Sequence, residues 1–221
     1  MNIYLESVDL DEIRTAASAG LADGVAFAHT ASDSDGSDAH TRERLEEISR
    51  EFAFPICVPV GAITSADIYS EARELAKISD HVVVQIPLVE DSLVPMSRLT
   101  AEGVVVCATF VYSAAQAIIA AKAGAAAVRV TLDDLERYGQ SGARTVAEIK
   151  SALETGEEEC DVMAASPLSP VQFAECALAG TDIICLTPET LRQLVVHPLS
   201  DRGVDRFLNE LARRPRSRVT T

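Results

Sequence analysis

Lysine is scarce in this sequence of 221 residues. Its 19 basic residues include only three lysines, Lys77, Lys122 and Lys150, so arginine supplies the other sixteen positive charges. Together they face 34 acidic residues, which gives a formal net charge of −15. A chain this acidic is repelled by the phosphates of nucleic acids and by anionic membrane surfaces. We therefore expect neither nucleic acid nor a membrane as a partner.

Long apolar runs and paired cysteines are also missing. No run of 18 apolar residues occurs, so no membrane-spanning segment is expected. The opening MNIYLESVDL has neither the basic region nor the apolar region of a secretory signal. The five cysteines are widely spaced, without a CxxC or CxxH pair, and four of them lie in apolar runs where Cys behaves as a small hydrophobe. We expect reduced thiols and a cytoplasmic location.

Short apolar segments alternate with helical patterns along the whole chain. Strand-like runs occupy 2–7, 24–28, 55–60, 81–87, 103–110, 126–132, 161–166 and 182–186, and a helical pattern follows each of them. Eight such units in series predict a single (β/α)8 TIM-barrel domain over residues 1–221, with an additional helix at 204–214. A doubly wound open sheet is the alternative. It is disfavoured because no glycine-rich phosphate loop follows the first strand.

One connection, HTASDSDGSDAH at 29–40, is longer than the others. Its two histidines and three aspartates resemble a metal cage in composition, but the spacing of its acidic residues fails the calcium-loop pattern. Ser, Asp and Gly are ordinary turn residues. We therefore expect a solvated loop and predict neither a metal nor a cofactor.

The strand HVVVQIP at 81–87 contains one amide, Gln85, among valines and an isoleucine. A buried amide without hydrogen-bond partners costs about 1–3 kcal/mol. Alternate residues of a barrel strand face the lumen, so an inward Gln85 leaves Val82, Val84 and Ile86 to pack on helices. The same alternation predicts inward positions on other strands for Glu6, Ala26, Ala28, Cys57, Pro59, Cys107, Thr109, Arg129, Thr131, Ala164 and Ser166.

Motifs along nearly the full length carry a family resemblance. They are NIYLES, HVVVQIP, LTAEGVVVCATFVYSAAQA, KAGAAAVRV, GQSGARTV, VMAASPLSPVQFAECALAG and LVVHP. With them the chain resembles the small transaldolase family, which includes fructose-6-phosphate aldolase. The resemblance implies a TIM barrel and a ring-like homo-oligomer, a pentamer or decamer. In such a ring the C-terminal helix and tail, about 200–221 with Phe207, Leu208 and Leu211, would make the contact.

The same resemblance indicates that the working residues have changed. It places the Schiff-base lysine of the family at Gln85, its first-strand aspartate at Glu6 and its phosphate-binding arginine at Asp134. Ala26, Ala28, Pro59 and Thr131 replace other polar positions, whereas Thr109 and Ser166 keep the family's residue types. A Schiff base needs an amine, the three lysines fall in helical patterns, and an aspartate repels a phosphate dianion. We therefore predict that lysine-aldolase chemistry and sugar-phosphate binding are both lost.

The remaining polar groups lead to a hypothesis for the chemistry. A buried carboxylic acid without its cation can serve as general acid or base, which makes Glu6 the expected proton carrier. Gln85 would hold Glu6 by one hydrogen bond and offer its NH2 group to a substrate carbonyl, beside Thr109. The residues expected to bind substrate are Tyr112, Thr131, Ser166, Cys57, Cys107 and Arg129.

Three functions follow from this set of residues. The first is an enzyme that dehydrates, isomerises or cyclises a small unphosphorylated carbonyl or polyol compound. The second is an inactive homologue that acts as a binding or assembly protein, in which Glu6 pairs with Arg129 and Gln85 only fills space. The third, a conventional transaldolase, is disfavoured because Gln85 replaces the lysine.

Overall fold

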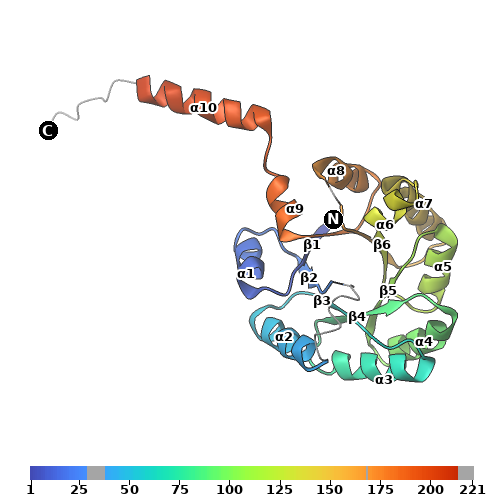
Figure 1. The fold of residues 1–221 in the computed structure, drawn as a ribbon. Coiled ribbons are helices and arrows are strands. Elements are labelled where there is room, and N and C mark those ends of the chain that lie inside the picture. Colours follow the sequence, from blue (N-terminus) through green and yellow to red (C-terminus); the bar gives the residue numbers. More distant parts are fainter. Residues whose placement is uncertain (29–37, 168, 214–221) are drawn as a thin grey trace.

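The computed structural model describes residues 1–28, 38–167 and 169–213. Eight parallel strands close into a barrel in chain order, β1 to β8, and helices surround it (Figure 1). The predicted TIM barrel is therefore confirmed. The strands are β1 (Asn2–Glu6), β2 (Gly24–Ala26), β3 (Ile56–Pro59), β4 (Val82–Pro87), β5 (Val105–Thr109), β6 (Ala127–Thr131), β7 (Asp161–Ala165) and β8 (Ile183–Leu186).

The helices follow the predicted segments, with two additions. A 3-10 turn, η2, precedes α4, and a short helix, α6, separates β6 from α7. The last helix begins six residues before the expected start at 204. The helical elements are α1 (Leu10–Ser18), α2 (Asp38–Glu51), α3 (Ser65–Ala76), η2 (Glu90–Ser92), α4 (Leu93–Ala101), α5 (Ala114–Lys122), α6 (Leu132–Arg137), α7 (Gly142–Thr155), α8 (Pro170–Leu178), α9 (Pro188–Gln193) and α10 (Pro198–Arg213).

The strands carry apolar side chains on both faces because each lies between the lumen and the helices. Val82, Val84 and Ile86 join the large cluster between barrel and helices, as predicted. A second cluster of buried residues lies in the lumen: Tyr4, Ala26, Cys57, Met163, Ala165, Ile183 and Cys185. Gln85 pairs in register with Pro59 on one side and Cys107 on the other. The amide therefore stands level with lumen residues of β3 and β5.

The prediction for β7 was wrong. Ala164 lies in the outer cluster, and its neighbours Met163 and Ala165 face the lumen instead. The strand ends at Ala165, and Ser166 then adopts a left-handed backbone with φ of +57°. Period-two alternation requires extended backbone, so counting backwards from Ser166 assigned the strand to the wrong face.

The helix α10 lies apart from the barrel (Figure 1). None of its residues is buried, and Phe207 and Leu208 are more than half exposed. Of the predicted loop at 29–40, residues 29–37 lie outside the described residues. Within the described part of the chain, every helix is too short or too polar to cross a lipid bilayer.

Candidate active site

Glu6, Arg129 and Gln85 form one chain of contacts across the lumen. Glu6 is the last residue of β1, Arg129 is central in β6 and Gln85 lies in β4. The Arg129 guanidinium forms an ion pair with Glu6 through Nη2 and donates from Nη1 to Gln85 Oε1 at 3.0 Å. The premise that Glu6 lacks a cation is therefore wrong: Arg129 supplies one from a different strand.

Burial and charge act in opposite directions on Arg129. Only 4% of the residue is exposed, and burial by itself lowers the pKa of its guanidinium. The ion pair and hydrogen bond with Glu6 oppose burial, and the pKa is raised overall. The guanidinium therefore stays charged in its contact with Glu6. Glu6 keeps 16% of its side chain accessible, which leaves the carboxylate within reach of a ligand.

Two hydrogen-bonding atoms beside this chain have no partner. Gln85 Nε2 and Thr109 Oγ1 are both buried, and neither makes a hydrogen bond with the described residues. The expected hydrogen bond from Gln85 to Glu6 is therefore wrong, because the Gln85 amide meets Arg129 instead. An unpaired buried donor costs about 1–3 kcal/mol. Gln85 and Thr109 lie on the neighbouring strands β4 and β5, whereas the third unpaired atom of this kind, Ser49 Oγ, lies on the outer helix α2.

Three buried thiols lie in the lumen near this group: Cys57, Cys107 and Cys185. Burial raises the pKa of the Cys107 and Cys185 thiols to about 12 and raises that of Cys57 well above its ordinary value. All three are therefore neutral at pH 7 and are poor nucleophiles. Cys185 also contacts Glu6, with 3.8 Å between Sγ and Oε2. Our sequence reasoning missed Cys185 because the alternation was not carried to the last strand.

The rim of the barrel carries a second polar group. Tyr112 Oη donates to Asp134 Oδ2 at 2.7 Å, and Arg137 approaches the other oxygen of Asp134 at 3.8 Å. Burial and the hydrogen bond to Asp134 together raise the pKa of Tyr112 to about 12, although Thr131 opposes them. Tyr112 lies beside Thr131 and donates to Asp134, a carboxylate that the sequence analysis considered only as a replaced phosphate ligand.

Strained backbone marks the ends of two strands. Phe110 directly follows Thr109 of β5 with φ of +59°, and Ser166 directly follows Ala165 of β7 with φ of +57°. Left-handed backbone costs a residue with a side chain roughly 1–3 kcal/mol and clusters at functional sites. Both positions lie at the carboxyl ends of strands, where TIM barrels carry their chemistry.

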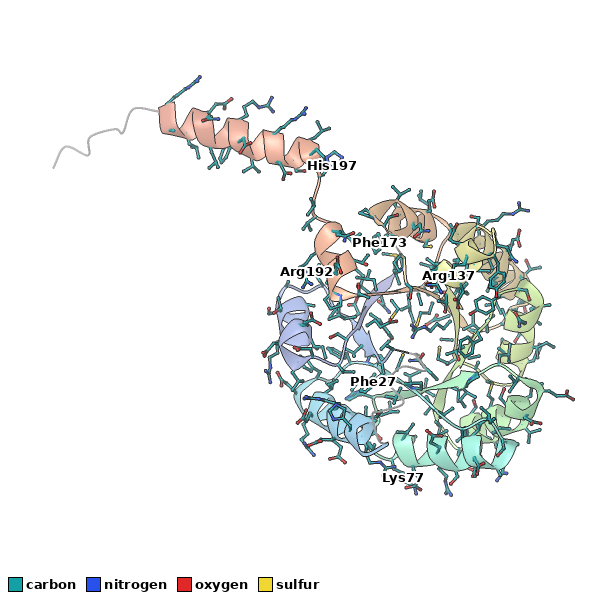
Figure 2. The ribbon with its side chains drawn as sticks, viewed as in Figure 1. Phe27, Lys77, Arg137, Phe173, Arg192 and His197 are labelled. Atoms are coloured by element: carbon teal, nitrogen blue, oxygen red, sulfur yellow. The ribbon has the colours of Figure 1, made fainter. Side chains whose placement is uncertain are left out.

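The three lysines all lie outside the barrel, Lys122 and Lys150 on helices and Lys77 directly after the end of α3. Lys77 points outward from the ring of helices (Figure 2) and contacts Glu74. Lys122, at the end of α5, pairs with Glu158, and Lys150 in α7 binds Asp182 at 2.7 Å. These placements agree with the prediction that lysine is absent from the barrel lumen. Among the described residues, His, Cys, Asp and Glu side chains also form no group of three suited to a metal.

Comparison with known proteins assigns the scaffold. The family model "Transaldolase/Fructose-6-phosphate aldolase" matches residues 33–217. A protein of Kosmotoga olearia named "Probable transaldolase" is 33% identical over 95% of this chain and 95% of its own. One of Herpetosiphon aurantiacus with the same name is 34% identical over 94% and 93%. A designed cube-shaped protein cage of fused symmetric oligomeric domains shares the fold, with a TM-score of 0.60, 14% identity and coverage of 95% of this chain and 76% of that chain.

Proposed function

This chain belongs to the transaldolase/fructose-6-phosphate aldolase family, and we propose that it works on that scaffold without a lysine Schiff base. The proposed substrate is a small unphosphorylated carbonyl or polyol compound bound at the carboxyl ends of the strands. Glu6 acts on it as a general base. One observation supports the proposal: the unpaired donors of Gln85 and Thr109 lie on neighbouring strands of the lumen that also holds Glu6, whose side chain is 16% exposed.

The groups have complementary roles in this reaction. Glu6, which forms an ion pair with Arg129, accepts a proton from the carbon next to a carbonyl or from a hydroxyl. Gln85 Nε2 and Thr109 Oγ1 donate to the substrate oxygen on which negative charge develops. Buried donors aimed at such an oxygen stabilise the transition state without reorganisation. Return of this proton from Glu6 to the neighbouring carbon completes an isomerisation, and its delivery to a departing hydroxyl group releases water and completes a dehydration. Neither step requires a lysine.

The rim supports an unphosphorylated substrate. Asp134 accepts a hydrogen bond from Tyr112 at 2.7 Å, which fixes this carboxylate at the rim. A phosphate dianion next to it would meet like charge. Polyol and carbonyl compounds carry no such charge and find hydroxyl groups on Tyr112 and Thr131.

Hydrogen exchange in D2O tests the proposal whatever product the reaction yields. Dihydroxyacetone and free ketoses, each beside its phosphate ester, are incubated with the protein, and proton NMR follows deuterium entering the position next to the carbonyl. We expect exchange of unphosphorylated compounds that falls by about 100-fold or more in Glu6→Gln. Glu148→Gln, a change of an exposed glutamate on α7, is the matched control and should exchange normally.

Borohydride trapping separates this function from conventional aldolase chemistry. Reduction in the presence of fructose 6-phosphate should leave no covalent adduct on the protein by mass spectrometry, because a Schiff base requires an amine. An adduct on a lysine, or undiminished exchange in Glu6→Gln, would refute the proposal and favour the transaldolase activity named for the relatives.

A further inference from the structure

Arg129 donates to the oxygen atoms of two side chains, Glu6 and Gln85. Its Nη2 meets the carboxylate of Glu6, and its Nη1 donates to the amide of Gln85. The structure assigns Arg129 the role of a positioning residue that fixes which end of the Gln85 amide faces the ligand. This assignment rests on the proposed function, because it concerns a ligand at the same place. It explains why Gln85 turns its NH2 group, and not its oxygen, toward the ligand.

The orientation of the amide follows from the chemistry of the guanidinium. A guanidinium has only donors, whereas a glutamine amide has an accepting oxygen at one end and a donating nitrogen at the other. Only Gln85 Oε1 can face Arg129, and the 3.0 Å contact has that arrangement. Nε2 is therefore turned away from Arg129. It is the atom left buried without a partner.

Arg129 is itself held from several sides. It is 4% exposed and lies within β6, paired in register with Met163 of β7. Glu6 Oε2, which it contacts, also lies 3.8 Å from the Cys185 thiol. Burial by itself lowers the pKa of Arg129, but the pKa is raised overall beside Glu6, so the guanidinium remains a donor at neutral pH. Rotation of the Gln85 amide would bring two donors face to face.

The consequence is a fixed polarity at the site. Gln85 presents N–H groups and Glu6 presents oxygen, so a ligand must offer an accepting oxygen to Gln85. Gln85→Glu tests this by an isosteric change. The new carboxylate would keep its contact with Arg129, but the outward group would change from donor to acceptor. We expect carbonyl ligands to lose about tenfold or more in affinity.

NMR of the side-chain amides measures the orientation directly. The chain has five glutamines, so 15N-glutamine labelling yields few signals, and Gln85→Glu identifies the pair that belongs to Gln85. Hydroxyacetone is the probe. Glu6→Gln is the reference variant, because it retains the contact between Arg129 and Gln85. Glu6→Gln/Arg129→Met removes the guanidinium without leaving an unpaired buried carboxylate, which protects the fold. Glu6→Gln/Arg129→Lys restores a donor.

The expected result has three parts. Hydroxyacetone shifts the Gln85 NH2 signals in the wild type and in Glu6→Gln, the response is lost in Glu6→Gln/Arg129→Met, and it returns with lysine at 129. An unchanged response in the methionine variant overturns the assignment, and so does the absence of any Gln85 response in the wild type. Failure of the proposed function is separate, because it shows as deuterium exchange that survives Glu6→Gln while the amide signals behave as described.

Discussion

Arg129 of β6 donates to Gln85 of β4 across the barrel lumen, with 3.0 Å between Nη1 and Oε1. The two strands are not neighbours in the barrel, since β5 lies between them. The contact therefore joins two strands that share no backbone pairing. Gln85 is fully buried and Arg129 nearly so, which makes the stability of the protein sensitive to charge at either position.

Gln85→Lys should destabilise the fold. The substitution places an ammonium group beside the Arg129 guanidinium, and a buried charge facing a like charge is strongly disfavoured. We expect the free energy of unfolding to fall by about 3 kcal/mol, as measured by urea denaturation. The neutral variant Gln85→Met is the control and should cost less.

A second substitution should relieve this cost. In Gln85→Lys/Arg129→Ala the guanidinium is gone, and the new ammonium group has Glu6 as its partner. We expect at least half of the lost stability to return in the same denaturation experiment. If the double variant lost more free energy of unfolding than the two single variants together, charge repulsion would not be the cause.

Asp182→Asn should weaken the opposite end of the barrel. Asp182 accepts from Lys150 Nζ at 2.7 and 2.8 Å and from the backbone N–H of Val162 at 2.8 Å, so it joins α7, β7 and the start of β8. We expect a loss of about 2 kcal/mol in the free energy of unfolding. Thermal or urea denaturation would measure it.

The matched control for Asp182 is a weaker contact of the same lysine. Glu154 lies 3.8 Å from Lys150 Nζ and is two-thirds exposed, so Glu154→Gln should change stability by only about 0.5 kcal/mol or less. Equal effects of the two substitutions would contradict the importance of the contact with Asp182.

Phe207→Asp should disrupt an oligomer formed through α10. Val204, Phe207, Leu208 and Leu211 make an exposed apolar stripe on a helix without buried residues. A charge in the middle of the stripe would oppose its burial against another copy. We expect light scattering after gel filtration to show an oligomer for the wild type and a smaller species for the variant. Arg206→Glu, on the opposite side of α10, should leave the mass unchanged.

The fold was predictable because its signals are local and repeated. Eight apolar runs, each followed by a helical pattern, appear as eight strands within one or two residues of the expected ends. The short helix α6 was missed because six residues carry little periodicity. Ala164 was misplaced because the left-handed Ser166 interrupts the alternation, and a single sequence gives no signal for that conformation.

The sequence predicted which residues face the lumen at the site, but not which of them contact one another. Alternation placed Glu6, Gln85 and Arg129 in the lumen, and the pairing of Glu6 with Arg129 was one of two alternatives. Which of these side chains contact one another depends on strand register and tilt around the closed barrel. Arg129, for example, is 123 residues from Glu6 along the chain. Sequence spacing cannot decide between partners on β1, β4 and β6. The unpaired Gln85 Nε2 became visible only once Arg129 was placed.

The buried thiols predict how the protein responds to high pH. Burial raises the pKa of Cys107 and Cys185 from an ordinary value of 9.0 to about 12. Above pH 9 the unfolded chain releases protons that the native state retains, so a rise in pH favours unfolding. Each such thiol removes up to about 1.4 kcal/mol of stability per pH unit until its native pKa is reached. Urea denaturation at pH 8 and pH 10 should therefore show a loss, and the loss should be smaller in Cys107→Ala.

Thiol alkylation at pH 8 tests the burial of these thiols. All five cysteines are buried, and reaction with iodoacetamide requires an accessible thiolate. We expect mass spectrometry to find almost no label on the native protein at pH 8 and five labels after denaturation in urea. Cys107 and Cys185 should be the last to react as urea is increased, because they lie inside the closed barrel whereas Cys160 and Cys176 lie outside the lumen. Fast labelling of Cys185 in the native protein would contradict its complete burial in the lumen.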